Sequence, residues 1–116
     1  MAADDFEVVA YKVLSYLYSC IKAGVEPNVA KAKDIAGVND VYWSAVVRSI
    51  ESDGLAEVDW FSHWAGREVD GLCITGKGAA YLKDNSRMQA VRRFLGEAFN
   101  AVLTTAVEAT MAMALR

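Results

Sequence analysis

The sequence predicts an α+β fold that is mostly helical, and two observations lead to this prediction. Apolar residues recur at helical spacing through most of the chain, whereas apolar and polar residues alternate in the strand-like stretches between residues 55 and 74. The 116 residues suit one domain, and 54% hydrophobic residues with a single proline are typical of a folded chain. We therefore expect helices around one short β-hairpin.

The first predicted helix covers residues 4–23 and carries two apolar stripes. One consists of Phe6, Val9, Val13, Leu17, Cys20 and Ile21, and the other of Val8, Tyr11, Ser15 and Tyr18. A helix that is apolar nearly all round buries two faces, so we expect it to pack against its own core and against a second surface. Gly24 ends this helix, and Pro27 and Asn28 form the connection.

Two shorter helices follow, at about residues 30–36 and 40–53. Gly37 supplies the turn between them, Asn39 is placed to cap the second, and Gly54 lies at its end. The core side of the second is predicted to hold Tyr42, Ala45, Val46, Ser49 and Ile50. Trp43, Ser44, Val47, Arg48 and Glu51 would then face outward.

Strands are predicted at residues 55–61 and 69–74, joined by the hairpin loop SHWAGRE. Thr75 caps a helix over 76–84, and Ser86 with Gln89 forms a capping box for a last helix over 87–115. Helix, short helix, turn, helix and hairpin is the element order of a winged helix-turn-helix. We therefore predict a winged helix-turn-helix domain at 1–85 with a two-stranded wing, and a long C-terminal dimerisation helix at 86–116.

The stretches DGLAEV and LCITGKGAAYLKDNS resemble those of the YjcQ family, small winged-helix proteins of bacteria and phages. The shared features are a glycine after the third helix, the hairpin, and the run formed by Ile74, Thr75, Gly78, Tyr81 and Leu82. The likeness covers roughly residues 4–90, and its motifs are moderately specific. It implies the fold and a bacterial or prophage origin, and it carries over no functional residues.

Five polar residues are candidates for DNA contact. Ser44 and Arg48 on the third helix would face bases, while Lys31, Lys33 and Arg67 would touch phosphates. The net charge of −3 gives no general attraction to a polyanion, so any such contact depends on a local patch. Six acids against one base in residues 51–70 would push the hairpin away from a phosphate backbone.

The alternative is a protein-interaction module on the same fold, with no DNA contact. It would use Trp43, Trp60 and Trp64, since exposed aromatics flanked by charge often mark a partner surface. Strand alternation places Trp60 and Phe61 on opposite faces, so one of them can be core while the other is exposed. These rings can also fold back onto the domain or pack in a dimer.

The last helix is apolar, with Glu97 and Glu108 as its only charges from Phe94 to Leu115. Near-heptad spacing marks a candidate dimerisation seam of Val91, Leu95, Ala98, Val102, Ala106 and Ala109. We expect this helix to pair with a second copy and with the outer stripe of the first helix. Packing within one chain is the alternative, and membrane insertion is disfavoured by the two glutamates.

No catalytic residues, metal ligands, cofactor or small-molecule ligand are predicted. His63 has no partners at metal-ligand spacing, and the TGKG segment lacks the full phosphate-loop pattern. Cys20 and Cys73 lie among apolar neighbours and are predicted to be buried, inert thiols. Asp4, Asp5 and Glu7 argue against a secretion signal, so we expect a cytoplasmic protein.

Overall fold

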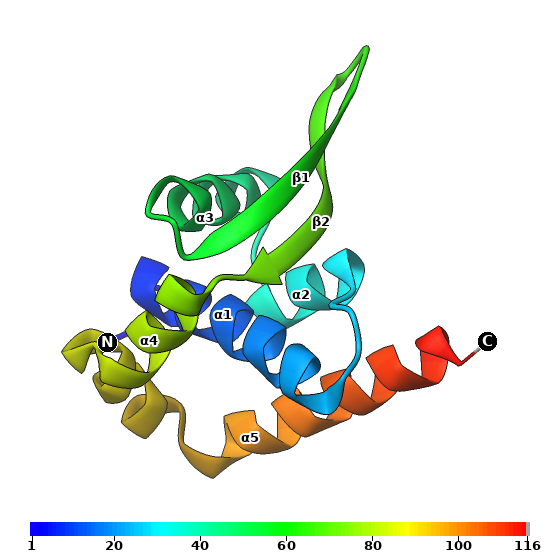
Figure 1. The fold of residues 1–116 in the computed structure, drawn as a ribbon. Helices are drawn as coiled ribbons and strands as arrows, with labels where there is room; N and C mark the ends of the chain where they lie inside the picture. Colours follow the sequence, from blue (N-terminus) through cyan, green and yellow to red (C-terminus); the bar gives the residue numbers. More distant parts are fainter. Residues whose placement is uncertain (116) are drawn as a thin grey trace.

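The structure, a computed structural model that describes residues 1–115, is an α+β fold in which helices predominate (Figure 1). These residues form five helices and one antiparallel pair of strands. The elements in order are α1 (Phe6–Ala23), α2 (Val29–Ala36), α3 (Asp40–Ser52), β1 (Ala56–His63), β2 (Gly66–Ile74), α4 (Gly76–Asp84) and α5 (Ser86–Ala114). Each predicted element is present, with its bounds shifted by three residues or fewer.

Helix α1 forms the centre of the molecule. It passes between α5 on one side and α2, α3 and the base of the hairpin on the other (Figure 1). Val9, Val13 and Leu17 are fully buried in the main core, while Val8 and Tyr11 belong to a second cluster shared with α5. The prediction that this helix buries two faces is confirmed, and the second face is covered by α5 of the same chain.

The helix ends follow local chemistry that the sequence carries. Asn39 and Thr75 cap α3 and α4, because their side-chain oxygens accept hydrogen bonds from the backbone N–H groups of Tyr42 and Gly78. The predicted capping box at the start of the last helix is wrong. Asn85 is the cap there, and its Oδ1 accepts from the N–H groups of Arg87 and Met88.

The β1–β2 hairpin packs on the core at its base and projects away at its tip (Figure 1). Leu72 and Ile74 of β2 point inward and are buried, so Cys73 between them points outward. The prediction of two buried thiols therefore holds for Cys20 and is wrong for Cys73, which is exposed. Burial raises the pKa of the Cys20 thiol.

The junction between the hairpin and α4 explains two residues of the Ile-Thr-x-x-Gly motif. The Thr75 hydroxyl donates to the Gly54 carbonyl at 2.7 Å and accepts from the Gly78 N–H at 2.9 Å. A Cβ atom on Gly78 would lie 1.9 Å from the Leu55 carbonyl oxygen, a separation that only glycine avoids. Both residues therefore hold α4 against the start of β1, which is a structural role.

Helix α5 is divided by a break at Gly96, whose φ of 63° and ψ of −159° lie outside the helical region. Before the break, Met88 and Val91 are buried against α1, and after it Phe99, Val107 and Thr110 are buried. We call residues 97–114, the part after the break, the C-terminal arm. The prediction of one uninterrupted helix is wrong, because the glycine redirects the chain so that both halves reach α1.

The predicted dimerisation seam is accordingly divided among three environments. Val91 is fully buried within its own chain, and Leu95, Ala106 and Ala109 are half-buried, whereas Ala98 and Val102 are exposed. Much of the apolar surface assigned to a second copy is instead covered by α1. The physical reason is the break at Gly96, which changes the face that each half of α5 turns toward the core.

A buried hydrogen-bond network fixes the far end of the arm. The Tyr16 hydroxyl and the Thr110 hydroxyl are 2.6 Å apart, and the Asn28 N–H donates to the Tyr16 oxygen at 3.0 Å. The Thr110 hydroxyl also donates to the Ala106 carbonyl, so the Tyr16 hydroxyl is the donor toward Thr110. Burial raises the pKa of Tyr16. One phenol thus connects α1, the arm and the start of α2.

Candidate nucleic-acid interface

A groove of about 450 Å³ separates α3 from the hairpin, and it brings together three of the five predicted DNA-contact residues. Ser44 and Arg48 line it from α3, and Arg67 lines it from β2. Ser44 and Arg48 lie one helical turn apart on the same face, and the Arg48 Nε donates to the Ser44 carbonyl at 3.3 Å. Both arginines are exposed. The groove therefore presents two guanidinium groups from opposite walls.

The hairpin wall of the groove is ordered by Trp60. The Arg67 guanidinium lies over the Trp60 ring at 4.7 Å from its centroid, which is cation–π geometry. The Trp60 Nε1 donates to both carboxylate oxygens of Glu51, each at 3.2 Å. Trp60 thus holds Arg67 in place and connects the hairpin to α3 through Glu51.

A second hollow, of about 640 Å³, continues from this groove between α2, α3 and the hairpin. Asp40, Ser44 and Arg67 line both hollows, and Lys33 contributes to the second from α2. Lys33 forms an ion pair with Asp40, which reduces the positive charge it adds. Lys33 therefore lies near Arg48 and Arg67 but contributes less positive charge to the groove than either arginine.

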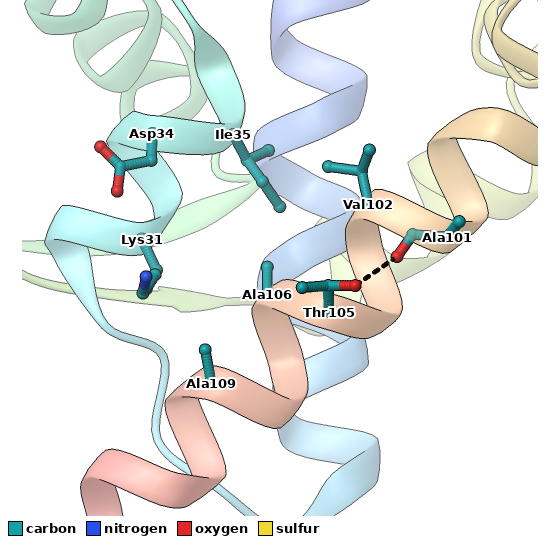
Figure 2. Close-up of a pocket in the computed structure, with 8 residues that line it drawn as sticks. All are labelled: Lys31, Asp34, Ile35, Ala101, Val102, Thr105, Ala106 and Ala109. Atoms are coloured by element: carbon teal, nitrogen blue, oxygen red, sulfur yellow. Dashed lines mark hydrogen bonds between the residues drawn. The ribbon is translucent and has the colours of Figure 1, made fainter.

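Lys31 lies apart from the other predicted contact residues. It points from α2 toward the C-terminal arm and lines a separate groove with Asp34, Ile35 and residues of α5 (Figure 2). Helix α2 has eight residues, and its buried positions are Ala32 and Ala36. The side chains of Lys31 and Lys33 therefore point to different sides of the helix. Helical spacing thus separates these two lysines, and the structure adds that α5 packs on the side where Lys31 lies.

The hairpin acids are divided between its two sides. Glu57 and Asp59 pair across the strands with Cys73 and Gly71, and they line a hollow beside the α1–α2 connection. The wall that faces α3 carries Trp60 and Arg67 instead. Glu68 and Asp70 line the second hollow with Lys33. The acid excess predicted to repel a polyanion is therefore partly turned away from the α3 groove.

Trp43 is not on the exposed side of α3, which corrects its assignment as an interaction residue. It is 5% exposed and packs in the main core with Val46, Val47 and Ile50. Tyr42, predicted to be core, lies at the edge, where its ring stacks on Phe6 and its hydroxyl donates to the Asp4 carbonyl. Positions 43, 46, 47 and 50 form a regular helical stripe, which is the pattern that identifies this face.

The two other candidate tryptophans differ in exposure. Trp60 is half-buried against the core, while Trp64 at the hairpin tip is 99% exposed. Phe61 is 56% exposed, so the expected division between Trp60 and Phe61 is confirmed. His63 lies beside the Phe61 ring and within 3.4 Å of a Glu68 carboxylate oxygen. The hairpin tip therefore presents apolar rings that its own chain does not cover.

A second group of basic residues, which the sequence analysis did not single out, lies on α4 and the first part of α5. Its members are Lys77, Lys83, Arg87, Arg92 and Arg93, and the intervening sequence has one acid, Asp84. Arg87 approaches Glu7 at 3.4 Å. Arg92 and Arg93 line a polar hollow at the break in α5, together with Gly96, Glu97 and Asn100. The crowding of cations in residues 77–93 is the sequence pattern that indicates this group.

Within residues 1–115, no three His, Cys, Asp or Glu side chains gather closely enough to hold a metal ion. No helix of these residues combines the length and apolar character needed to cross a bilayer. A scan against protein-family models, a search of curated proteins and a search of solved structures each find no match. The likeness to the YjcQ family rests on the motif residues alone.

Proposed function

We propose that the chain is a winged helix-turn-helix DNA-binding protein, a homodimeric transcriptional regulator of bacterial or prophage origin that works in the cytoplasm. Helices α2 and α3 would form the helix-turn-helix, and the β1–β2 hairpin would form the wing. The observation that carries this proposal is the groove in which Ser44, Arg48 and Arg67 meet between α3 and the hairpin.

The roles of the groove residues follow from their geometry. Arg48 lies on the outer face of α3 and would reach a base edge, where arginine commonly binds guanine through two hydrogen bonds. Arg67, held over Trp60, would bind a backbone phosphate from the hairpin side. Val41 is 79% exposed at the start of α3 and offers an apolar contact to a thymine methyl group.

A salt-dependent polarisation titration on mixed genomic DNA fragments tests this proposal. Binding should weaken steeply with salt, and Arg67→Ala should reduce the log–log slope by about 0.9, the value for one lost phosphate contact. Arg48→Ala should weaken binding to the preferred fragments by about 1–3 kcal/mol. Lys31→Ala is the matched control, because that side chain lines the α2–α5 groove, and it should leave the slope unchanged.

The alternative function is a protein-interaction module without DNA contact, and the exposed hairpin tip favours it. Trp64 and Phe61 together present an apolar surface at a projecting end of the molecule, flanked by Glu68 and Arg67. This alternative predicts no DNA binding at low salt and an unchanged result for Arg48→Ala. Absence of binding at low salt would therefore remove the DNA-binding proposal and leave the hairpin tip as the functional surface.

A further inference from the structure

The C-terminal arm is joined to the rest of the molecule through one residue, Gly96. Its φ of 63° and ψ of −159° are the only non-helical pair within α5, and this region of backbone conformation is essentially confined to glycine. A Cβ atom there would meet no neighbouring atom within 4 Å, so the backbone conformation, and not packing, requires the glycine. Two helical segments that run in different directions therefore meet at a single hinge (Figure 1).

The sequence around this hinge also suits an unbroken helix. The segments on both sides of Gly96 are helical, so helical φ and ψ at this one position would join them into one straight helix. Arg93 and Glu97 would then lie one turn apart with opposite charges. Val91 and Val102 would point within about 20° of each other, whereas the bend buries the first and leaves the second 52% exposed. Helix α5 therefore has two shapes available to it, bent and straight.

The straight shape would carry the arm away from its own α1. A straight helix of 29 residues is about 43 Å long, which exceeds the longest dimension of the molecule, 41 Å. Both halves of α5 reach α1 only because the chain changes direction at Gly96. A straight α5 would keep its first half on α1 and project the arm beyond it, and the part of α1 that the arm covers would be left open.

The arm of a second copy fits the surface that is left open, because one chain already makes the same contacts with itself. The Phe99 ring packs against Tyr11 with 5.9 Å between the ring centroids, and the Tyr16 and Thr110 hydroxyls are 2.6 Å apart. A second copy carries the same side chains, so these contacts can form between chains as they do within one. The buried hydroxyl pair also sets the register, since an arm shifted by one turn would leave both hydroxyls without that partner.

We propose that two copies of the chain form a dimer by exchanging arms. In both copies α5 straightens at Gly96, and each arm packs on α1 of the other copy. Exchange of an identical element is a low-cost route to a dimer, because the bent and the exchanged forms contain the same arm contacts. The two forms then differ mainly in the hinge conformation and in the entropy of association, so the dimer should become more populated with concentration.

This inference deepens the homodimer of the proposed function and does not require DNA contact. Helix α5 packs on the side of α1 that faces away from the projecting hairpin, so exchange leaves both α3–hairpin grooves uncovered by the arms (Figure 1). An exchanged dimer without DNA affinity would retain this inference and remove the DNA-binding proposal, whereas a DNA-binding monomer would do the reverse.

Size-exclusion chromatography of Gly96→Ala tests the hinge. Alanine disfavours the bent conformation and favours the straight helix, so this variant should lower the dissociation constant of the dimer at least about a hundredfold relative to the unmodified chain. Gly76→Ala is the matched control, because it makes the same substitution at a helical glycine without a positive φ, and it should leave the dissociation constant unchanged. A folded Gly96→Ala variant that stays monomeric would overturn the proposal.

The unmodified chain supplies a second measurement, which does not depend on the folding of that variant. After unfolding and refolding at high concentration it should yield a dimer that persists on dilution, because each arm must leave α1 before the copies can separate. A chain that refolds only to monomers, or a dimer that dissociates at once on dilution, would overturn the proposal. Circular dichroism of each sample checks that the fold is retained.

Thiol cross-linking shows which chain each arm packs on. Lys31 of α2 and Ala109 of the arm line the same groove (Figure 2). A chain with Lys31→Cys and Ala109→Cys, in a Cys73→Ser background that leaves only the buried Cys20, is treated with a short bismaleimide. The monomer fraction should then be linked within one chain, and the dimer fraction should run as a covalent dimer on a denaturing gel. The two single variants are the controls, and each should give little of either product. Dimers that separate into internally linked single chains would show that each arm stays on its own α1, which would overturn the proposal.

Discussion

The middle of α1 and the tip of the hairpin are opposite extremes of this molecule. Val9, Val13 and Leu17 are fully buried, with helices of the same chain on both sides, whereas Trp64 is 99% exposed. Around α1, close packing of neighbouring elements accounts for the residue types present. At the hairpin tip no packing accounts for a tryptophan. Stability therefore explains the residues of the first region, whereas those of the second contribute little to packing and belong to the alternative proposal of an interaction surface.

The three tryptophans show the same gradient from core to tip. Trp43 is buried in the core, Trp60 is half-buried between Glu51 and Arg67, and Trp64 is fully exposed. Substitution of the first should affect folding, and substitution of the last should affect only binding. The changes below test this contrast in order of their expected effect on the free energy of unfolding.

The largest effect is expected from Gly78→Ala. The new methyl group would meet the Leu55 carbonyl oxygen and an Ile74 side-chain carbon, so α4 must move off the base of the hairpin. Overpacking against backbone should lower the free energy of unfolding by about 3 kcal/mol or more. Urea denaturation followed by circular dichroism measures this change.

Gly76→Ala supplies the control for that substitution. Gly76 is in the same helix, has no atom within 4 Å of the added Cβ position, and does not have a positive φ. Alanine there should leave stability unchanged or raise it by up to about 1 kcal/mol. Equal losses in the two variants would show that α4 does not pack on Leu55 as described.

An intermediate effect is expected from Tyr16→Phe. The change removes the hydroxyl that bonds Thr110 and accepts from the Asn28 N–H, and it leaves those groups without that partner. The free energy of unfolding should fall by about 1–3 kcal/mol. Hydrogen exchange should increase in the arm and at the start of α2.

Tyr18→Phe is the comparison for Tyr16→Phe. Its hydroxyl makes no hydrogen bond within residues 1–115, and its ring lies under the Lys22 ammonium, a contact that phenylalanine retains. Stability should change by less than about 0.5 kcal/mol. A Tyr16→Phe variant as stable as this one would mean that the buried network does not hold the arm.

The smallest effect on folding is expected from Trp64→Ala. With its side chain 99% exposed, the indole buries almost nothing, so the free energy of unfolding should change by less than about 0.5 kcal/mol. Thermal unfolding of the two proteins measures this difference. A loss above about 1 kcal/mol would show that the ring packs on the domain and that the contrast with α1 is wrong.

The order of helices and strands could be predicted from the sequence because secondary-structure preferences depend on neighbouring residues. Helical periodicity, the alternation in the two strands and the turn glycines each act within a few residues. Asn39 and Thr75 could be assigned as caps for the same reason, since each bonds an N–H three residues along the chain. Residue type predicts Arg67, residue type and an outward position on the third helix predict Ser44 and Arg48, and the structure brings the three into one groove.

The error on α3 arose between two stripes of the same spacing. Positions 42, 45, 46 and 49 repeat as 43, 46, 47 and 50 do, but the first stripe ends in Ser49 and only the second is apolar throughout. The second stripe is the buried one, because the core accommodates the indole of Trp43 while Phe6 and Asp4 hold Tyr42 at the edge. Lys31 and Lys33 lie on different sides of α2 because of helical spacing, but the groove that Lys31 lines exists only because α5, a helix distant in sequence, packs there.

Local residue preferences are enough to place five helices and a hairpin in this order within residues 1–115. The packing of the whole chain is needed to show that both halves of α5 cover α1, that Trp43 is buried, and that Arg48 and Arg67 share a groove. Burial depends on which helix and strand faces pack against one another. Periodicity shows which faces are apolar, but it does not show which of them pack together.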